Sequence, residues 1–202
     1  MFIFLVFKLF ITINAFSYVE RKFDAQAVGI DQLNNLEFPE LDENPIKFDE
    51  NWLILPKNNV TQMNIFVSLG SLKNLEQLRK ILPNTYFFIA DPNISQKSEK
   101  SSHFFAFEVS SEAGFSTVPK VDINYFFNGI LGAKFIDFMW NSAENGLEIV
   151  EKIEKTTVCQ IILTGKLPKN LPNNFVIFKT SKNGVLLLNI KDDECKQKYG
   201  YF

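Results

Sequence analysis

From residue 64 onward, short apolar runs alternate with segments in which apolar residues recur every three or four positions. The runs have the length of buried strands, and the segments between them have the period of amphipathic helices. This alternation is typical of βαβ units around a parallel sheet. Residues 64–202 are therefore predicted to form one α/β domain with a mostly parallel sheet, and the 202-residue chain is long enough to bury its core.

The pattern predicts seven strands and three helices. The expected strands are Ile65–Ser68, Tyr86–Ala90, His103–Val109, Phe135–Trp140, Val158–Leu163, Phe175–Lys179 and Val185–Ile190. The expected helices are Lys73–Leu82, Ile123–Leu131 and Glu144–Lys155. Asn183-Gly184 lies between the last two strands and is a strong two-residue hairpin signal. The sheet is therefore expected to end in a C-terminal antiparallel hairpin.

The N-terminus carries a targeting signal. Met1–Phe16 is almost wholly apolar, which is shorter than the roughly 20 residues that a spanning helix needs. Ala15 and Ser17 fit the small-residue rule for signal-peptide cleavage. We predict a signal peptide at 1–17 and a protein that is secreted or resides in the secretory-pathway lumen. The alternative is an uncleaved membrane anchor, because Lys8 interrupts the apolar run and no basic residue precedes it.

Residues 18–63 are predicted to be an irregular acidic linker and N-terminal extension. Tyr18–Glu50 shows no sustained helix or strand period, and six acidic residues gather there near Pro39 and Pro45. A solvated stalk explains this composition better than a binding role. Trp52–Leu55 is expected to be a short strand or a cap.

Composition argues against two classes of ligand. A formal net charge of −2 gives no long-range field that would attract a polyanion, so nucleic acid is not an expected partner. The 22 phenylalanines fall mainly inside short apolar runs and are interpreted as core. No cysteine or histidine spacing resembles a metal site, and His103 is the only histidine. The interaction partner, whether an acceptor or a protein, stays unknown at this stage.

Secretory entry would expose two cysteines and two sequons to modification. Cys159 and Cys195 could form one disulfide, although Cys159 lies in an apolar run where a free thiol often serves as a small buried hydrophobe. The second interpretation is preferred. Asn59-Val60-Thr61 and Asn93-Ile94-Ser95 satisfy the glycosylation sequon, which also occurs often by chance. Asn93 follows a predicted strand end directly, where crowding disfavours a glycan.

Polar residues follow several expected strands, at the edge where parallel sheets bind ligands. Gly70, in the turn Ser68–Ser71, would let backbone amides approach a nucleotide. Asp91 is placed to accept hydrogen bonds from ribose hydroxyls, or else starts a turn with Pro92. Asp122 opens an expected helix and is interpreted as its N-cap. The polar stretch 141–146 follows another strand, and helix initiation explains it almost as well.

Several motifs occur in a fixed order along the domain. They are Val67-Ser68-Leu69-Gly70-Ser71, Ala90-Asp91-Pro92, the segment 105–114, Val121-Asp122, the segment 136–145, Leu188-Asn189-Ile190 and Glu194-Cys195. This order resembles that of the FkbM-type methyltransferases. The resemblance implies a Rossmann-like methyltransferase fold and S-adenosylmethionine as the cofactor. It further implies that Ser68, Gly70, Ser71 and Asp91 contact the cofactor, and that Glu144 orients or deprotonates an acceptor hydroxyl.

The sequence departs from the family pattern in both diagnostic motifs. Leu72-Lys73-Asn74 follows Ser71 where the family has further glycines and a polar residue for the methionine part of the cofactor. The family's aspartate falls on Ser142 and its glycine on Asn145. A serine cannot supply a carboxylate's charge or act unaided as a general base at neutral pH.

Two hypotheses follow. The favoured one is a secretory-pathway pseudoenzyme or binding module that keeps the fold and has lost methyl transfer. The alternative is an active S-adenosylmethionine-dependent methyltransferase that acts on a hydroxyl-bearing acceptor, with in-line attack at the sulfonium methyl.

Overall fold

The structure is a computed structural model that describes residues 45–57, 63–95, 101–143, 145–165 and 171–200. The described residues belong to one compact unit, Leu41–Phe202. The predicted signal peptide at 1–17, most of the predicted linker, Asn59 and Glu144 lie outside the described residues. Among the described residues, no helix has the length and apolar composition that a membrane crossing requires.

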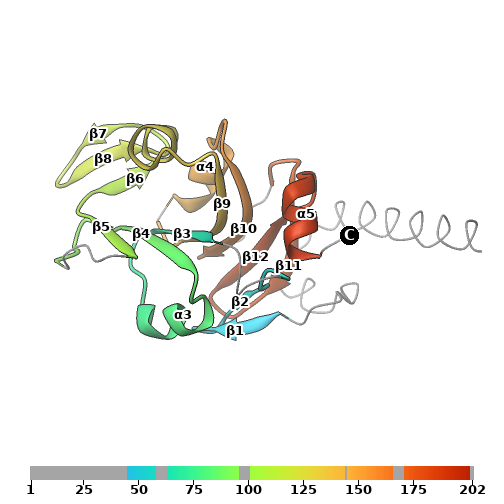
Figure 1. Ribbon diagram of the computed structural model, residues 1–202. Coiled ribbons are helices and arrows are strands. Elements are labelled where there is room, and N and C mark those ends of the chain that lie inside the picture. The colour runs from blue at the N-terminus through green and yellow to red at the C-terminus, as the bar shows by residue number, and fades with distance from the viewer. Residues whose placement is uncertain (1–44, 58–62, 96–100, 144, 166–170, 201–202) are drawn as a thin grey trace, which may run out of the picture. The chain divides into compact units, whose positions relative to one another are not determined.

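The centre of the fold is a seven-stranded mixed sheet with the order β11-β12-β10-β9-β3-β4-β5 (Figure 1). Its strands are β3 (Asn64–Leu69), β4 (Thr85–Ala90), β5 (Ser102–Phe105), β9 (Phe135–Asn141), β10 (Thr157–Thr164), β11 (Phe175–Thr180) and β12 (Gly184–Asn189). The five strands from β10 to β5 are parallel, whereas β12 pairs antiparallel with both β10 and β11. The prediction of an α/β domain with a mostly parallel sheet and a C-terminal antiparallel hairpin is confirmed.

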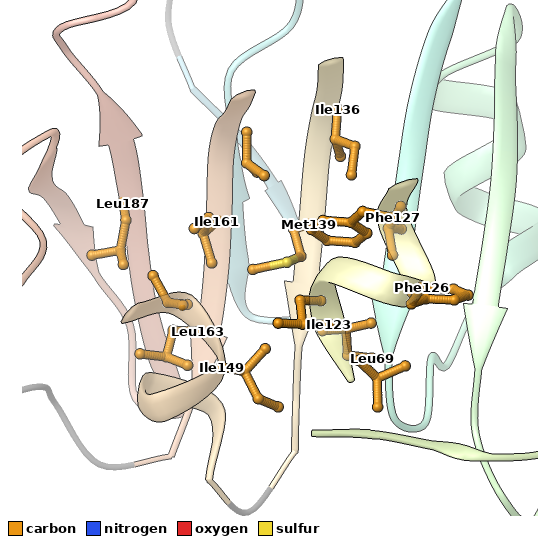
Figure 2. Packing of buried hydrophobic residues seen from close by; sticks show 14 of the residues in the cluster. Leu69, Ile123, Phe126, Phe127, Ile136, Met139, Ile149, Ile161, Leu163 and Leu187 are labelled. Atoms are coloured by element: carbon orange, nitrogen blue, oxygen red, sulfur yellow. The ribbon is translucent and has the colours of Figure 1, made fainter. Parts of the chain in front are cut away.

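One face of the sheet is covered by the helix η2 (Tyr125–Leu131) and the helix α4 (Gly146–Glu151), which Figure 2 shows against the strands. Alternate residues of a strand point to the same face, and Val67 and Leu69 of β3 both lie in the cluster of buried apolar side chains on this face. The helices contribute buried side chains that include Phe126, Phe127 and Ile149. The apolar side chains of the strands and those of the two helices therefore pack together as one core.

The opposite face is built around aromatic rings. Phe66 lies 5.6 Å from Phe87 and 6.0 Å from Phe138, measured between ring centroids. Tyr199, from the C-terminal helix α5 (Asp193–Tyr199), packs edge-on against Phe138 at 5.6 Å. Phe66, Phe87, Phe138 and Tyr199 are all buried. The interpretation of the phenylalanines as core is therefore correct for these rings.

An N-terminal hairpin also covers this second face, in a stretch where the sequence predicts only a short strand or cap at Trp52–Leu55 within an irregular linker and extension. It consists of β1 (Ile46–Phe48) and β2 (Asn51–Leu53), which pair antiparallel. The side chain of Gln160 in β10 accepts from the Ile54 amide at 3.0 Å and donates to the Ile54 carbonyl at 2.7 Å. Phe48 packs edge-on against Trp140, with ring centroids 6.0 Å apart. The packed domain therefore begins well before residue 64.

After β5, the chain forms a second, three-stranded sheet that is separate from the central one. Its order is β6 (Glu108–Ser110), β8 (Pro119–Asp122) and β7 (Gly114–Phe115). The single strand expected over His103–Val109 is therefore two strands. The first ends where Phe105 pairs with Ala90, and the second pairs with β8, where Lys120 forms an ion pair with Glu108 at 3.1 Å.

The helices match the expected positions with changes in length and type. The helix α3 (Leu75–Ile81) confirms the helix expected over Lys73–Leu82. The segment expected as a regular helix at Ile123–Leu131 is mostly π-helical, and it ends at Gly132 in a left-handed conformation. The helix expected to reach Lys155 stops at Glu151, because the Asn124 side chain bonds the Lys152 carbonyl and the Glu154 amide in place of helical partners.

A disulfide joins Cys159 in β10 to Cys195 in α5, with 5.3 Å between the two Cα atoms. The preferred interpretation of Cys159 as a free buried thiol is therefore wrong, and the alternative is correct. The crosslink closes a separation of 36 residues. Such a loop stabilises a fold by about 3 to 4 kcal/mol in the chain-entropy description. It fixes the C-terminal helix to the centre of the sheet.

Candidate functional site

The carboxyl ends of the five parallel strands line up in one row. Leu69 pairs with Ala90 on one side and with Asn141 on the other. Ala90 pairs in turn with Phe105, and Asn141 with Leu163. Loops that follow these strands therefore emerge side by side. This edge is where open α/β sheets bind ligands.

The chain order changes direction between β3 and β9. The chain adds β4 and then β5 on one side of β3, and later returns to place β9 and β10 on its other side. Such a point is the preferred ligand position in doubly wound sheets, because the loops on either side turn away from each other. Gly70 and Ser142 are the first residues after β3 and β9. The two residues that the sequence singled out in separate motifs thus face each other at this point.

Gly70 is held tightly in this position. Its φ of +92° is a conformation that side chains rarely adopt, and a β-carbon built on it would lie 2.5 Å from the Ser142 hydroxyl oxygen. The Ser142 hydroxyl donates to the Leu69 carbonyl at 3.2 Å, and the Ser142 amide donates to the same carbonyl at 2.9 Å. The Ser142 side chain is therefore folded back onto β3.

The backbone amides at the row of strand ends are already bonded. The Gly70 amide donates to the Ala90 carbonyl at 2.8 Å, and the Asp91 amide donates to the Phe105 carbonyl at 3.0 Å. These bonds continue the sheet ladder by one residue beyond each strand. An amide with such a partner is not free to bind a phosphate or a carboxylate. The Gly70 amide itself is therefore committed to the sheet in this arrangement.

The two serines beside Gly70 differ in exposure. Ser68 is fully buried, and its hydroxyl donates to the Gly70 carbonyl at 3.2 Å. Ser71 is exposed and follows Gly70 directly. Of these two serines, Ser68 therefore stabilises the turn from within, and Ser71 is the one that solvent reaches.

Asp91 lies at the end of β4 and is partly exposed. One carboxylate oxygen accepts from the Asn93 amide at 2.9 Å, and the Asp91 carbonyl accepts from the Ile94 amide at 3.0 Å. Asp91 therefore starts a turn through Pro92, as one of its two expected roles required. The second carboxylate oxygen accepts no hydrogen bond from the described residues, so it is the anionic atom at this edge that a ligand could reach.

The loop after β9 is fixed by a buried amide. Asn141 donates to the Gly146 carbonyl at 2.9 Å and accepts from the Ala143 amide at 3.2 Å. Both bonds shape the start of α4, so helix initiation accounts for much of the polar stretch 141–146. Asn141 opens the polar stretch that the sequence singles out, although the sequence pattern assigns Asn141 no role of its own. Glu144, the expected catalytic residue, lies in this loop outside the described residues.

The remaining candidates are structural. Asp122 accepts from the amides of Asn124 and Tyr125 at 2.9 and 3.0 Å, which confirms that it caps the helix that follows. Among the described residues, no three His, Cys, Asp or Glu side chains gather in a group that could hold a metal ion. The ring of His103 stacks on Phe88, with centroids 5.2 Å apart. None of these groups adds a reactive side chain to the edge.

Comparison of the chain with family models, with curated proteins and with solved structures finds no match.

Proposed function

We propose that this protein is a divergent, Rossmann-like methyltransferase-fold protein that enters the secretory pathway and serves there as a pseudoenzyme or binding module. The five parallel strands follow the order 3-2-1-4-5 of doubly wound nucleotide-binding sheets. The final antiparallel hairpin, which the Asn183-Gly184 signal predicts, extends the sheet beyond β10. These two features support the fold assignment.

The observation that carries the loss of function is the contact between Gly70 and Ser142. In the resemblance, these positions belong to the cofactor turn and to the carboxylate of the second motif. Here the Ser142 hydroxyl lies against Gly70 and bonds the Leu69 carbonyl. A neutral group that is committed to the backbone cannot attract a sulfonium or polarise an acceptor hydroxyl.

The alternative is an active S-adenosylmethionine-dependent methyltransferase, and one observation favours it. The second carboxylate oxygen of Asp91 is directed to no described partner, at the strand end where a ribose would lie. In this alternative, Gly70 and Asp91 hold the cofactor and Glu144 acts on a hydroxyl-bearing acceptor. Proximity and alignment would supply most of the acceleration.

Secretory entry is proposed from the apolar run Met1–Phe16 together with the disulfide between Cys159 and Cys195. Disulfides persist in oxidising compartments and are rare in reducing ones. An uncleaved N-terminal anchor would place the same domain on a membrane, on the oxidising side.

Calorimetric titration with S-adenosylmethionine separates the two functions without knowledge of the acceptor. We expect no saturable heat up to about 1 mM cofactor, which corresponds to a binding free energy weaker than about −4 kcal/mol. The active alternative predicts saturable binding that the substitution Asp91→Ala abolishes. Glu194→Ala is the matched control, because it also removes an exposed carboxylate. Glu194 lies on α5, whose N-cap Asp192 accepts a hydrogen bond from Thr157 at the start of β10, which is the end of the strand away from the candidate site.

A further inference from the structure

We propose that Asn93 carries an N-linked glycan at the edge of the candidate site. This inference rests on the proposed secretory entry and adds a modification site to it. Its sequence requirement is met by Asn93-Ile94-Ser95, in which the middle residue is not proline. The sequence pattern disfavours a glycan at Asn93 because the residue directly follows a strand, and the geometry of the turn removes that objection.

The turn presents the acceptor side chain to solvent. Asn93 and Ser95 are both exposed, whereas Ala90, at the end of β4, is buried. Asn93 is the third residue of a four-residue turn that the bond from the Ile94 amide to the Asp91 carbonyl closes at 3.0 Å. The Asn93 side chain therefore stands clear of the ladder of β4, and its modification would break no strand pairing.

The first residue of the turn, Asp91, also stabilises it through its side chain. The backbone amide of Asn93 donates to the Asp91 carboxylate at 2.9 Å, and Pro92 restricts the backbone between these two residues. The Asn93 side chain takes part in none of these bonds. Its amide nitrogen is therefore free to serve as the acceptor in the described structure.

The disulfide supplies an independent indication of the same compartment. Cys159 and Cys195 lie far from the turn in the sequence, and such a crosslink is typical of an oxidising environment. The transfer of glycans to asparagine occurs in that environment. In the reaction, the Asn93 amide nitrogen bonds the anomeric carbon of a lipid-diphosphate-linked oligosaccharide, loses one proton, and displaces the lipid diphosphate.

The position of the glycan matters for function. Asn93 lies two residues beyond Asp91, whose carboxylate is the predicted ribose contact. A bulky and hydrophilic group here would stand at the rim of the carboxyl edge of the sheet. It would obstruct a nucleotide that approaches Asp91 more than it would obstruct a partner that binds elsewhere on the domain, which fits a pseudoenzyme better than an enzyme.

The test uses the full chain expressed in a eukaryotic secretory host. Peptide-N-glycosidase in ¹⁸O-labelled water converts each modified asparagine to labelled aspartate, which mass spectrometry then locates. The variant Asn59→Gln removes the other sequon. In that variant we expect one remaining glycan, which Asn93→Gln and Ser95→Ala each abolish and which Ser95→Thr retains.

The outcomes separate this proposal from secretory entry. A chain with no free thiol but with an unmodified Asn93 peptide would overturn the glycan while leaving secretory entry intact. A chain that stays in the cytosol with both thiols free would overturn secretory entry and the glycan together.

Discussion

At the scale of single residues, Gly70 is restricted in two independent ways. Its φ of +92° disfavours any side chain, and a β-carbon there would meet the Ser142 hydroxyl oxygen at 2.5 Å. The first restriction comes from the Gly70 backbone and the second from the Ser142 side chain, so a substitution at Ser142 can separate the two. This separation decides how tightly the two motif positions are coupled.

We predict that Gly70→Ala destabilises the fold by more than the roughly 1 to 3 kcal/mol that the backbone conformation alone costs. Ser142→Ala should cost about 1 kcal/mol, for the lost bond to the Leu69 carbonyl. The double variant should be more stable than the sum of the two effects implies, because the overlap is gone. Urea unfolding of the four proteins measures this coupling. Strict additivity would mean that Ser142 does not press on Gly70.

A second residue-scale prediction concerns Asp137, which is buried and has three donors. Its carboxylate accepts from the Ile65 amide at 2.8 Å and from the Tyr199 hydroxyl at 2.8 Å, and it pairs with Lys198 at 2.5 Å. Asp137→Asn keeps the shape but leaves the largely buried Lys198 ammonium without its counter-charge. We expect a loss of about 3 to 5 kcal/mol.

Tyr199→Phe is the matched control for this network. It keeps the ring on Phe138 and removes one hydrogen bond to a charged group, so its expected cost is about 1.5 to 3 kcal/mol. Chemical denaturation measures the free energy of unfolding of both variants, provided that the m-value stays unchanged. If Asp137→Asn were no more harmful than Tyr199→Phe, the ion pair would not be what fastens the C-terminal helix.

At the scale of elements, the hairpin of β1 and β2 is an integral layer of the domain. It covers Trp140 through Phe48, and Gln160 satisfies both backbone groups of Ile54. A chain that begins at residue 64 would uncover this face of the sheet. A chain that begins at residue 45 would keep it covered.

We therefore predict that the chain from residue 45 folds cooperatively and that the chain from residue 64 does not. The shorter chain should bind a hydrophobic dye and lose its near-ultraviolet circular dichroism while it keeps secondary structure. In the full chain, Gln160→Ala should cost about 1 to 3 kcal/mol for each orphaned group of Ile54. Equal near-ultraviolet spectra for the two truncated chains would show that the hairpin is dispensable.

Strands were predictable from the sequence where burial on both faces leaves a continuous apolar run. Thr157–Thr164 is such a case, since six consecutive residues of it are buried. The strands β7 and β8 were missed because both are short, β7 is exposed and β8 is only partly buried, so no apolar pattern marks them. The helix α5 was missed although Asp192 caps it and Gly200 ends it, because its polar sequence shows little apolar periodicity.

The candidate site was predictable in location and not in bonding. The order of the strands, which determines that Gly70 and Ser142 meet, follows from pairing between segments more than 70 residues apart, as the bond from Ser142 to Leu69 illustrates. Local pattern carries no information on that pairing. It therefore could not show that the Gly70 amide is taken by the Ala90 carbonyl. The turn at Asp91, in contrast, is one of the two roles that the local Asp91-Pro92 pair predicts.

At the scale of the whole molecule, most polar groups at the carboxyl edge of the sheet bond to one another. The amides of Gly70, Asp91 and Ser142 continue the ladder, and the hydroxyls of Ser68 and Ser142 bond the adjacent backbone. Such a surface is stable without a ligand. It agrees with a fold that persists after the loss of methyl transfer.

The most direct test of this account is the calorimetric titration of the disulfide-bonded, full-length protein with S-adenosylmethionine. The account predicts no saturable binding up to about 1 mM, and the same result for Asp91→Ala and for Glu194→Ala. Saturable binding that Asp91→Ala abolishes and Glu194→Ala preserves would contradict it, and would establish a working cofactor site at the end of β4.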